Sequence, residues 1–217
     1  GCRTGRNVYG KWSKLQWRYY RWIYYRMVEE VDAEIGRVLR AVEQSDEKEN
    51  TIVIFTSDHG DGVGSHQMVG KLFPYEEAVK VPFIISCPGK VAKGVKDTTH
   101  LISGLDLVPT ICDYAGVPIP PKTHGSSIHP ILQGNSKPWR EYIVGEVAVT
   151  GRYIRTSHYK YVSYKNDPVK QLFDIKADPG EMENLAGNPI YKKEMVRHQK
   201  LLDEWEKSLS YMTDSIT

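Results

Sequence analysis

Four side chains near the middle of the chain are suited to binding a cation and an anion. Asp58 and His59 are adjacent, and His66 and Lys71 follow within one glycine-rich stretch. Carboxylate and imidazole groups ligate metals, whereas an ammonium group binds an anionic oxygen as a point charge. We therefore take Asp58 and His59 as candidate metal ligands, and Lys71 and His66 as candidate catalytic residues.

The glycines around these residues bear on whether they can act together. Side chains that follow one another at a strand end point apart, so Asp58 and His59 reach one ion only if the chain bends. Gly60 and the glycines after it permit such a bend. In the alternative interpretation, Asp58 caps a turn and His59 is a solvated loop residue. A single lysine such as Lys71 is usually a solvated surface charge as well, and the local sequence alone leaves both interpretations open.

A buried strand is predicted directly before the candidate residues. Residues 51–56 form a continuous apolar run between polar turns, which indicates a strand buried on both faces, as in the centre of a parallel sheet. Sites in open α/β sheets lie at the carboxyl ends of strands. The position of Asp58 and His59 therefore favours a site over a turn.

Further elements of an α/β domain flank this strand. Apolar residues recur along 13–44 at three- and four-residue steps, which predicts a long helix with one apolar stripe. A short strand is expected at 82–86. A helix is expected at 106–115, with Asp106 as its N-cap and Gly116 just after its last turn.

The pattern changes after a connection rich in proline, glycine and serine at 117–138. Segments 142–149, 152–162 and 171–175 contain alternating, β-branched and aromatic residues, which is typical of an antiparallel sheet. A terminal helix is expected at 190–209. We predict an α/β fold with two parts: residues 1–125 end a mixed sheet flanked by helices, and residues 126–217 form a small α+β subdomain.

Composition excludes several classes of protein. The chain has 217 residues, 40% of them hydrophobic and 26% charged, which indicates a globular protein. Its net charge of +2 is too small to indicate binding to nucleic acid. We expect no membrane segment. The three cysteines do not form a disulfide framework. The start at Gly1 has neither an initiator methionine nor a signal-peptide pattern, so we expect an internal starting point.

Ordered motifs along nearly the whole chain resemble the C-terminal portion of the type I sulfatases, in the alkaline-phosphatase-like superfamily. The motifs are YRMVEEVD at 25–32, TSDHGDGVGSH at 56–66, GK at 70–71, YEEAVKVP at 75–82, LDLVPT at 105–110, DYAGV at 113–117, GSSI at 125–128, LQG at 132–134, YKY at 159–161, LFDI at 172–175, DPGE at 178–181 and ENL at 183–185. Each motif is weak by itself, but their order and spacing resemble those of the family.

The resemblance implies roles for three residues. Asp58 and His59 match two ligands of the family's divalent cation, usually calcium, and Lys71 matches the lysine that contacts the sulfate ester. Calcium prefers oxygen ligands, and many members have asparagine where His59 stands, so manganese or zinc is the alternative.

The resemblance also implies that the nucleophile lies elsewhere. Family members use a formylglycine made from the first residue of a C-x-P-S-R motif. Cys2 and Arg6 imitate its ends, but Thr4 and Gly5 depart from it. We therefore expect the formylglycine and the remaining metal ligands in an N-terminal portion outside this chain, which is then its partner in the complete enzyme.

The expected activity is hydrolysis of sulfate esters, with sulfated carbohydrates expected before other sulfated small molecules. Arg152, His158 and the loop 122–127 are candidate walls of the substrate pocket. The family resemblance implies a periplasmic, extracellular or lysosomal location. One alternative is a phosphonate monoester or phosphodiester hydrolase of the same superfamily, and another is a fragment that is inactive by itself.

Overall fold

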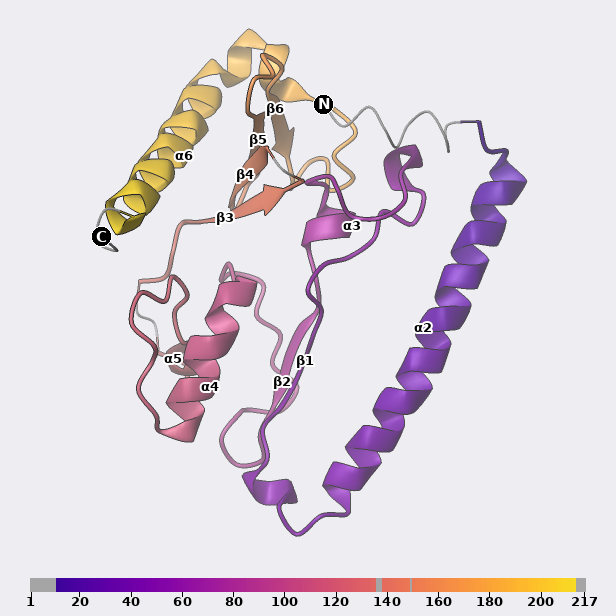
Figure 1. Ribbon diagram of the computed structural model, residues 1–217, viewed down its shortest axis with the longest axis vertical. Coiled ribbons are helices and arrows are strands. Elements are labelled where there is room, and N and C mark those ends of the chain that lie inside the picture. The colour runs from indigo at the N-terminus through magenta and orange to yellow at the C-terminus, as the bar shows by residue number, and fades with distance from the viewer. Residues whose placement is uncertain (1–10, 136–137, 149, 214–217) are drawn as a thin grey trace.

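The computed structural model describes residues 11–135, 138–148 and 150–213, so the segment with Cys2 and Arg6 lies outside the described residues. The helices are α2 (Lys14–Glu43), α3 (Glu76–Val79), α4 (Leu107–Ala115), α5 (His129–Leu132) and α6 (Lys192–Thr213). The strands are β1 (Val53–Thr56), β2 (Phe83–Ser86), β3 (Tyr142–Val147), β4 (Gly151–Thr156), β5 (Tyr159–Tyr164) and β6 (Gln171–Asp174). In Figure 1 the two-stranded sheet of β1 and β2 runs through the middle, between α2 on one side and α4 on the other.

The long helix α2 begins at a capping box, as its sequence permits. The Ser13 side chain accepts a hydrogen bond from the Gln16 amide, and the Gln16 side chain accepts one from the Ser13 amide at 2.7 Å. This reciprocal pair satisfies two amides that the helix itself leaves unpaired. The predicted helix at 13–44 is confirmed to within a residue at each end.

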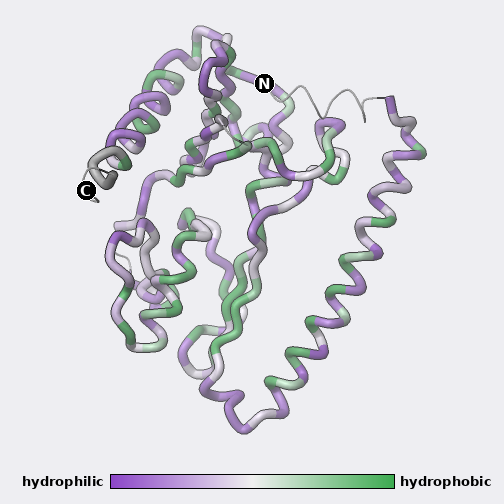
Figure 2. The backbone as a smooth tube through the Cα atoms, in the orientation of Figure 1, coloured by the Kyte–Doolittle hydropathy of each residue, from purple (hydrophilic) through white to green (hydrophobic). Residues whose placement is uncertain are grey.

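An apolar groove lies between α2 and the two-stranded sheet of β1 and β2. It has a volume of about 1240 Å³, and its lining includes Val31 and Val38 of α2, Phe55 of β1 and Ile84 of β2. These four side chains are between 41% and 64% exposed. Figure 2 shows β1 and β2 as one of the most apolar parts of the tube. A groove of this kind marks a binding surface more often than a solvated one.

The prediction of β1 as the centre of a parallel sheet is wrong for the described residues. β1 pairs antiparallel with β2, so that Val53 lies opposite Ser86 and Thr56 opposite Phe83, in a sheet of two strands. An apolar run indicates that both faces of a strand need cover. It contains no information about the direction of the neighbouring strand, which depends on the connection between them.

The second sheet has the antiparallel order β3-β4-β5-β6, as predicted. The segment expected at 152–162 is divided by a bend at Ser157 and His158 into β4 and β5. Thr156 Oγ1 accepts a hydrogen bond from the Tyr159 amide at 3.0 Å and closes this bend. A change of strand with so short a bend leaves the β-type residue pattern unbroken, which is why the sequence shows one segment.

Both faces of this sheet are covered. On one face, Ile154, Tyr161 and Leu172 form a core with Leu202 of α6. On the other, Val147, Tyr153, Val162 and Phe173 form a second core, against which Tyr75 and Val79 pack. The second core therefore joins the sheet to the segment around α3.

The helix α4 ends as predicted, with Gly116 in the left-handed conformation at φ 66°. Asp106 occupies the predicted N-cap position of α4, but its side chain makes no capping hydrogen bond to this helix. The buried carboxylate of Asp106 accepts hydrogen bonds from the amides of Ser103 and Ser126 and binds Arg140 at 2.8 and 2.6 Å. It fixes the connection after α4. Among the helices that the structure describes, none has the length and apolarity needed to cross a membrane.

One buried histidine predicts a dependence of stability on pH. His198 of α6 lies with Nδ1 2.8 Å from the Glu194 carbonyl and Nε2 3.3 Å from Thr156 Oγ1, and burial lowers its pKa from 6.5. The unfolded chain therefore binds this proton at a higher pH than the folded chain. The contribution of His198 to stability is complete above pH 6.5 and is lost as the pH falls from there toward the lower pKa of the folded state.

We expect His198→Gln to reduce the loss of melting temperature between about pH 7.5 and about pH 5.5, the range in which an ordinary histidine titrates. Thermal unfolding followed by circular dichroism at both pH values measures the effect. His124→Gln, in the exposed connection, is the control and keeps the wild-type loss. Equal losses for wild type and His198→Gln would contradict the prediction.

Candidate metal centre

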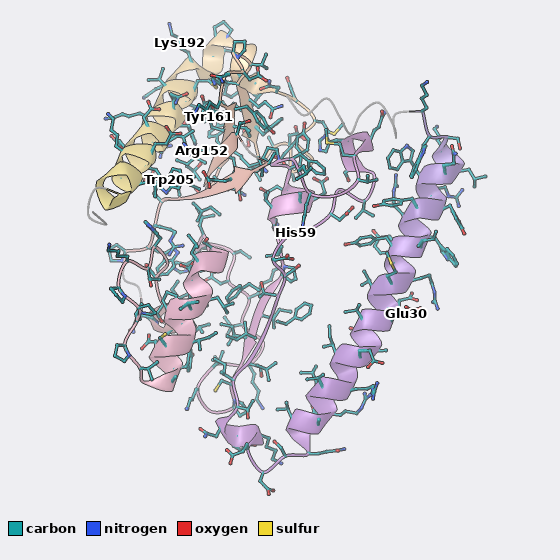
Figure 3. The ribbon with its side chains drawn as sticks, viewed as in Figure 1. Glu30, His59, Arg152, Tyr161, Lys192 and Trp205 are labelled. Carbon is teal, nitrogen blue, oxygen red and sulfur yellow. The ribbon has the colours of Figure 1, made fainter. Side chains whose placement is uncertain are left out.

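The chain bends sharply after β1 and brings Asp58 and His59 together. The His59 amide donates a hydrogen bond to Asp58 Oδ1 at 2.9 Å, and Asp58 Oδ2 lies 3.3 Å from His59 Nε2. Figure 3 places His59 between the end of β1 and α3. The hydrogen bond from the His59 amide lowers the pKa of the exposed Asp58 carboxyl, and the positive charge of Lys71 lowers it further. Asp58 is therefore ionised at neutral pH.

The hydrogen bonds of His59 define the state of its ring. Nδ1 lies 2.8 Å from the carbonyl oxygen of Gly60, which can only accept, so Nδ1 donates and carries the proton. The lone pair of Nε2 is then free to accept. The Lys71 ammonium group makes a close contact with Nε2. The lone pair of His59 thus already faces a positive charge.

The spacing of the two donors suits a shared cation. A nitrogen ligand lies about 2.1 Å from a metal and an oxygen ligand about 2.4 Å from it. If the angle between the two ligands at the metal is about 90°, their atoms lie about 3.2 Å apart. The distance between Asp58 Oδ2 and His59 Nε2 is 3.3 Å. Within the described part of the chain, no group of three or more His, Cys, Asp or Glu side chains converges to hold a metal. Asp58 and His59 are therefore spaced as two ligands of one cation would be.

The backbone of α3 holds the bend in place. The Gly60 amide donates to the Ala78 carbonyl at 2.8 Å, and a Cβ at position 60 would lie 2.0 Å from the carbonyl oxygen of Glu77. Only glycine permits so close an approach. The bend that joins the two candidate ligands therefore depends on where α3 lies.

Asp61 organises the loop that carries Lys71, a role that the sequence analysis missed. Its Oδ1 accepts a hydrogen bond from the Val63 amide at 2.7 Å and one from the Tyr20 hydroxyl at 3.3 Å, while its Oδ2 accepts from the Gly70 amide at 3.1 Å. These bonds join the two ends of the loop and fasten it to α2. An aspartate between two glycines was the available signal, because such residues commonly bond nearby amides.

His66 lies in a different environment from the other three candidates. It has a positive φ of 52°, its ring stacks on Tyr75 at 3.7 Å, and Nε2 is 4.0 Å from Glu77 Oε2. These contacts join His66 to the residues at the start of α3. The structure thus brings together Asp58, His59 and Lys71, and packs His66 against Tyr75.

Two of the candidate walls of the substrate pocket, Arg152 and His158, form ion pairs with neighbouring carboxylates. Arg152 pairs with Glu146 at 2.9 Å and with Glu206 at 2.6 Å. Its guanidinium group also lies over the ring of Trp205, a residue of α6 (Figure 3). His158 pairs with Asp174 at 3.1 Å. Both side chains contribute to packing within the second sheet and α6.

Comparisons with known proteins agree with the fold. Residues 64–208 match the family described as N-sulphoglucosamine sulphohydrolase, C-terminal, and residues 9–117 match the family described as Sulfatase. The chain belongs to the sulfatase family. Members of this family are sulfuric ester hydrolases that use a divalent metal and a formylglycine.

The similarity extends to individual proteins. The chain is 37% identical over 205 residues to the Delta 4,5-hexuronate-2-O-sulfatase of Bacteroides thetaiotaomicron, covering 89% of this chain and 42% of that protein. A solved 2-O GAG sulfatase superposes with a TM-score of 0.86 at 34% identity, over 95% of this chain and 47% of the other. The phosphonate monoester hydrolase of Agrobacterium radiobacter superposes with a TM-score of 0.81 at 27% identity, over 91% and 43%. The chain spans less than half the length of each of these proteins. The sequence-based predictions of the family and of an α/β fold are confirmed.

The bend at Gly60 yields a prediction for metal binding. We expect Gly60→Ala to weaken binding of a divalent cation about 10- to 100-fold, the loss typical when the support of a ligand is disturbed, because the new Cβ displaces α3 or the bend. Calorimetric titration of the complete enzyme with calcium measures it. Gly187→Ala is the matched control, since a Cβ there meets nothing within 4 Å. Unchanged affinity in Gly60→Ala would show that the bend does not depend on this contact.

Proposed function

We propose that this chain supplies two metal ligands and the sulfate-binding lysine of a sulfatase, and that the complete enzyme hydrolyses sulfate esters of carbohydrates. The convergence of Asp58, His59 and Lys71 at the end of β1 is the observation that supports it most directly. A sulfate ester presents anionic oxygens, and this site offers it an ammonium group beside two ligands for a cation. The similarity to a hexuronate-2-O-sulfatase supports a carbohydrate as the substrate.

Each residue has a distinct task in this proposal. Asp58 and His59 hold the metal, which when bound polarises and neutralises a sulfuryl oxygen. The hydrogen bond from His59 Nδ1 to the Gly60 carbonyl fixes the tautomer whose Nε2 can act as a ligand. Lys71 binds a sulfuryl oxygen and stabilises the charge that develops on it during ester cleavage. His66 positions the loop through Tyr75.

We propose calcium as the metal. Asp58 provides a hard, ionised oxygen ligand, which calcium favours. The nitrogen ligand from His59 makes manganese and then zinc the next candidates. The formylglycine nucleophile and the remaining ligands come, in this proposal, from the N-terminal portion of the same protein.

The apolar groove is where we place that N-terminal portion. Val38, Phe55 and Ile84 expose apolar surface there, which association with the rest of the α/β domain would remove from water. We propose that residues 1–125 complete this domain and that residues 126–217 form the subdomain beside it. A periplasmic, extracellular or lysosomal location is part of the same proposal.

Substitutions in the complete enzyme test the roles of the ligands and of the lysine. We expect Asp58→Ala to abolish calcium binding in a calorimetric titration. We expect Lys71→Met to lower kcat for an aryl sulfate about 10²- to 10³-fold, the usual loss when a group that stabilises transition-state charge is removed. Lys192→Met, an exposed lysine on α6 far from His59 in Figure 3, is the control. Near wild-type turnover by Lys71→Met would refute its role.

A second candidate is hydrolysis of phosphonate monoesters, which the similarity to the Agrobacterium radiobacter enzyme favours. The same metal and lysine could bind a phosphoryl group, so the comparison of substrates must decide. We expect kcat/KM of the complete enzyme to be higher for an aryl sulfate than for the matched aryl phosphonate. A preference for the phosphonate by orders of magnitude would make it the function.

A further inference from the structure

A buried cluster of charges lies between α3 and the second sheet. Lys160 of β5 is fully buried, and its Nζ lies 2.9 Å from Glu76 Oε1 and 2.5 Å from Glu181 Oε1. The Glu181 side chain is also fully buried, and that of Glu76 is 15% exposed. Arg155 Nε approaches Glu76 Oε1 at 3.5 Å. We call Lys160, Glu76 and Glu181 the charge clamp.

Stability alone is a weak reason for such a cluster. Removing charges from water is costly, and a buried ion pair is often no more stable than well-packed apolar side chains of similar volume. What a buried pair does provide is a single permitted geometry, because any displacement leaves a charge without its partner. The charge clamp therefore fixes position more than it adds stability.

The position that it fixes is that of α3. Glu76 is the first residue of α3, and its amide also donates to Glu181 Oε2 at 2.6 Å. Tyr75, just before it, packs on Phe173 of β6 with ring centroids 5.9 Å apart. The start of α3 is thus held to the second sheet by the ion pair with Lys160 and the ring contact with Phe173, and to the loop after β6 by the hydrogen bond to Glu181.

The other side of α3 contacts the candidate metal centre. Its Ala78 carbonyl accepts the Gly60 hydrogen bond, and the Glu77 carbonyl lies against the same glycine. Figure 1 shows α3 between the end of β1 and the second sheet. A shift of α3 away from the sheet would pass directly to the bend that brings Asp58 and His59 together.

We propose that Lys160, with Glu76 and Glu181, positions the metal centre from the second sheet by fixing α3 against Gly60. Lys160 touches neither metal nor substrate and acts only through α3. The identity of the positioned centre rests on the proposed function, whereas the mechanical link from Lys160 to the bend does not.

Amide hydrogen exchange of the complete enzyme tests this link. Lys160→Met removes the charge with little change in volume and leaves two carboxylates facing each other. We expect exchange in residues 57–64 to accelerate at least tenfold, and calcium affinity in calorimetric titration to fall about 10- to 100-fold, as for other residues that support a metal ligand.

The matched control is Leu202→Ala, which damages the core on the opposite face of the same sheet. It lowers the melting temperature but leaves exchange in residues 57–64 and calcium affinity as in wild type. If Lys160→Met does not unfold cooperatively, Glu181→Gln replaces it, since the amide keeps the size of the side chain and loses the charge. The same acceleration in residues 57–64 is expected.

The outcomes separate the two proposals. Unchanged exchange in residues 57–64 after loss of the clamp charge, or equal acceleration in Leu202→Ala, overturns the positioning role. Exchange is measured without metal, so it decides this question even if the wild-type enzyme binds no calcium and cleaves no sulfate ester. That latter result would instead overturn the proposed function.

Discussion

Gly60 donates its amide hydrogen to the Ala78 carbonyl at 2.8 Å, and the space between the two backbones is too small for a side chain. Several features depend on this contact. It turns the chain directly after β1, so that two consecutive side chains converge instead of pointing apart. It also connects the candidate centre to α3, and through Tyr75 and Val79 to the core of the second sheet. The candidate site at the end of β1 is thereby supported by the core of the second sheet as well as by its own two-stranded sheet.

The charged side chains of the candidate centre are exposed to water. The Asp58 side chain is 81% exposed, and Lys71 is exposed as well. At such exposure water screens charges, and their effect on a bound ester is small. Charges arranged for catalysis act strongly where water is excluded. In the proposed complete enzyme, one further part of the protein would cover both the exposed centre and the exposed apolar groove beside α2.

The sequence predicts those features that depend on local interactions. The periodicity of residues 13–44 is enough for α2, and Gly116 for the end of α4, because helix periodicity and left-handed backbone are local properties. The prediction that β1 lies at the centre of a parallel sheet is wrong for the described residues, because strand direction depends on the chain that connects the strands. The family motifs located Asp58, His59 and Lys71, whereas the convergence of the first two required the contact between Gly60 and α3, which no local pattern encodes.

The roles of the motif residues explain why the resemblance identifies the family more firmly than the substrate. Glu76, Asp106, Lys160 and Glu181 belong to four of the motifs, and each forms buried charge contacts between segments distant in the sequence. Such residues specify how the chain packs, and they place no group on a substrate. A 2-O GAG sulfatase and a phosphonate monoester hydrolase share this architecture. Under the proposed function, Asp58, His59 and Lys71 suit either anion, so selection between sulfate and phosphonate esters would come from other residues of the substrate pocket.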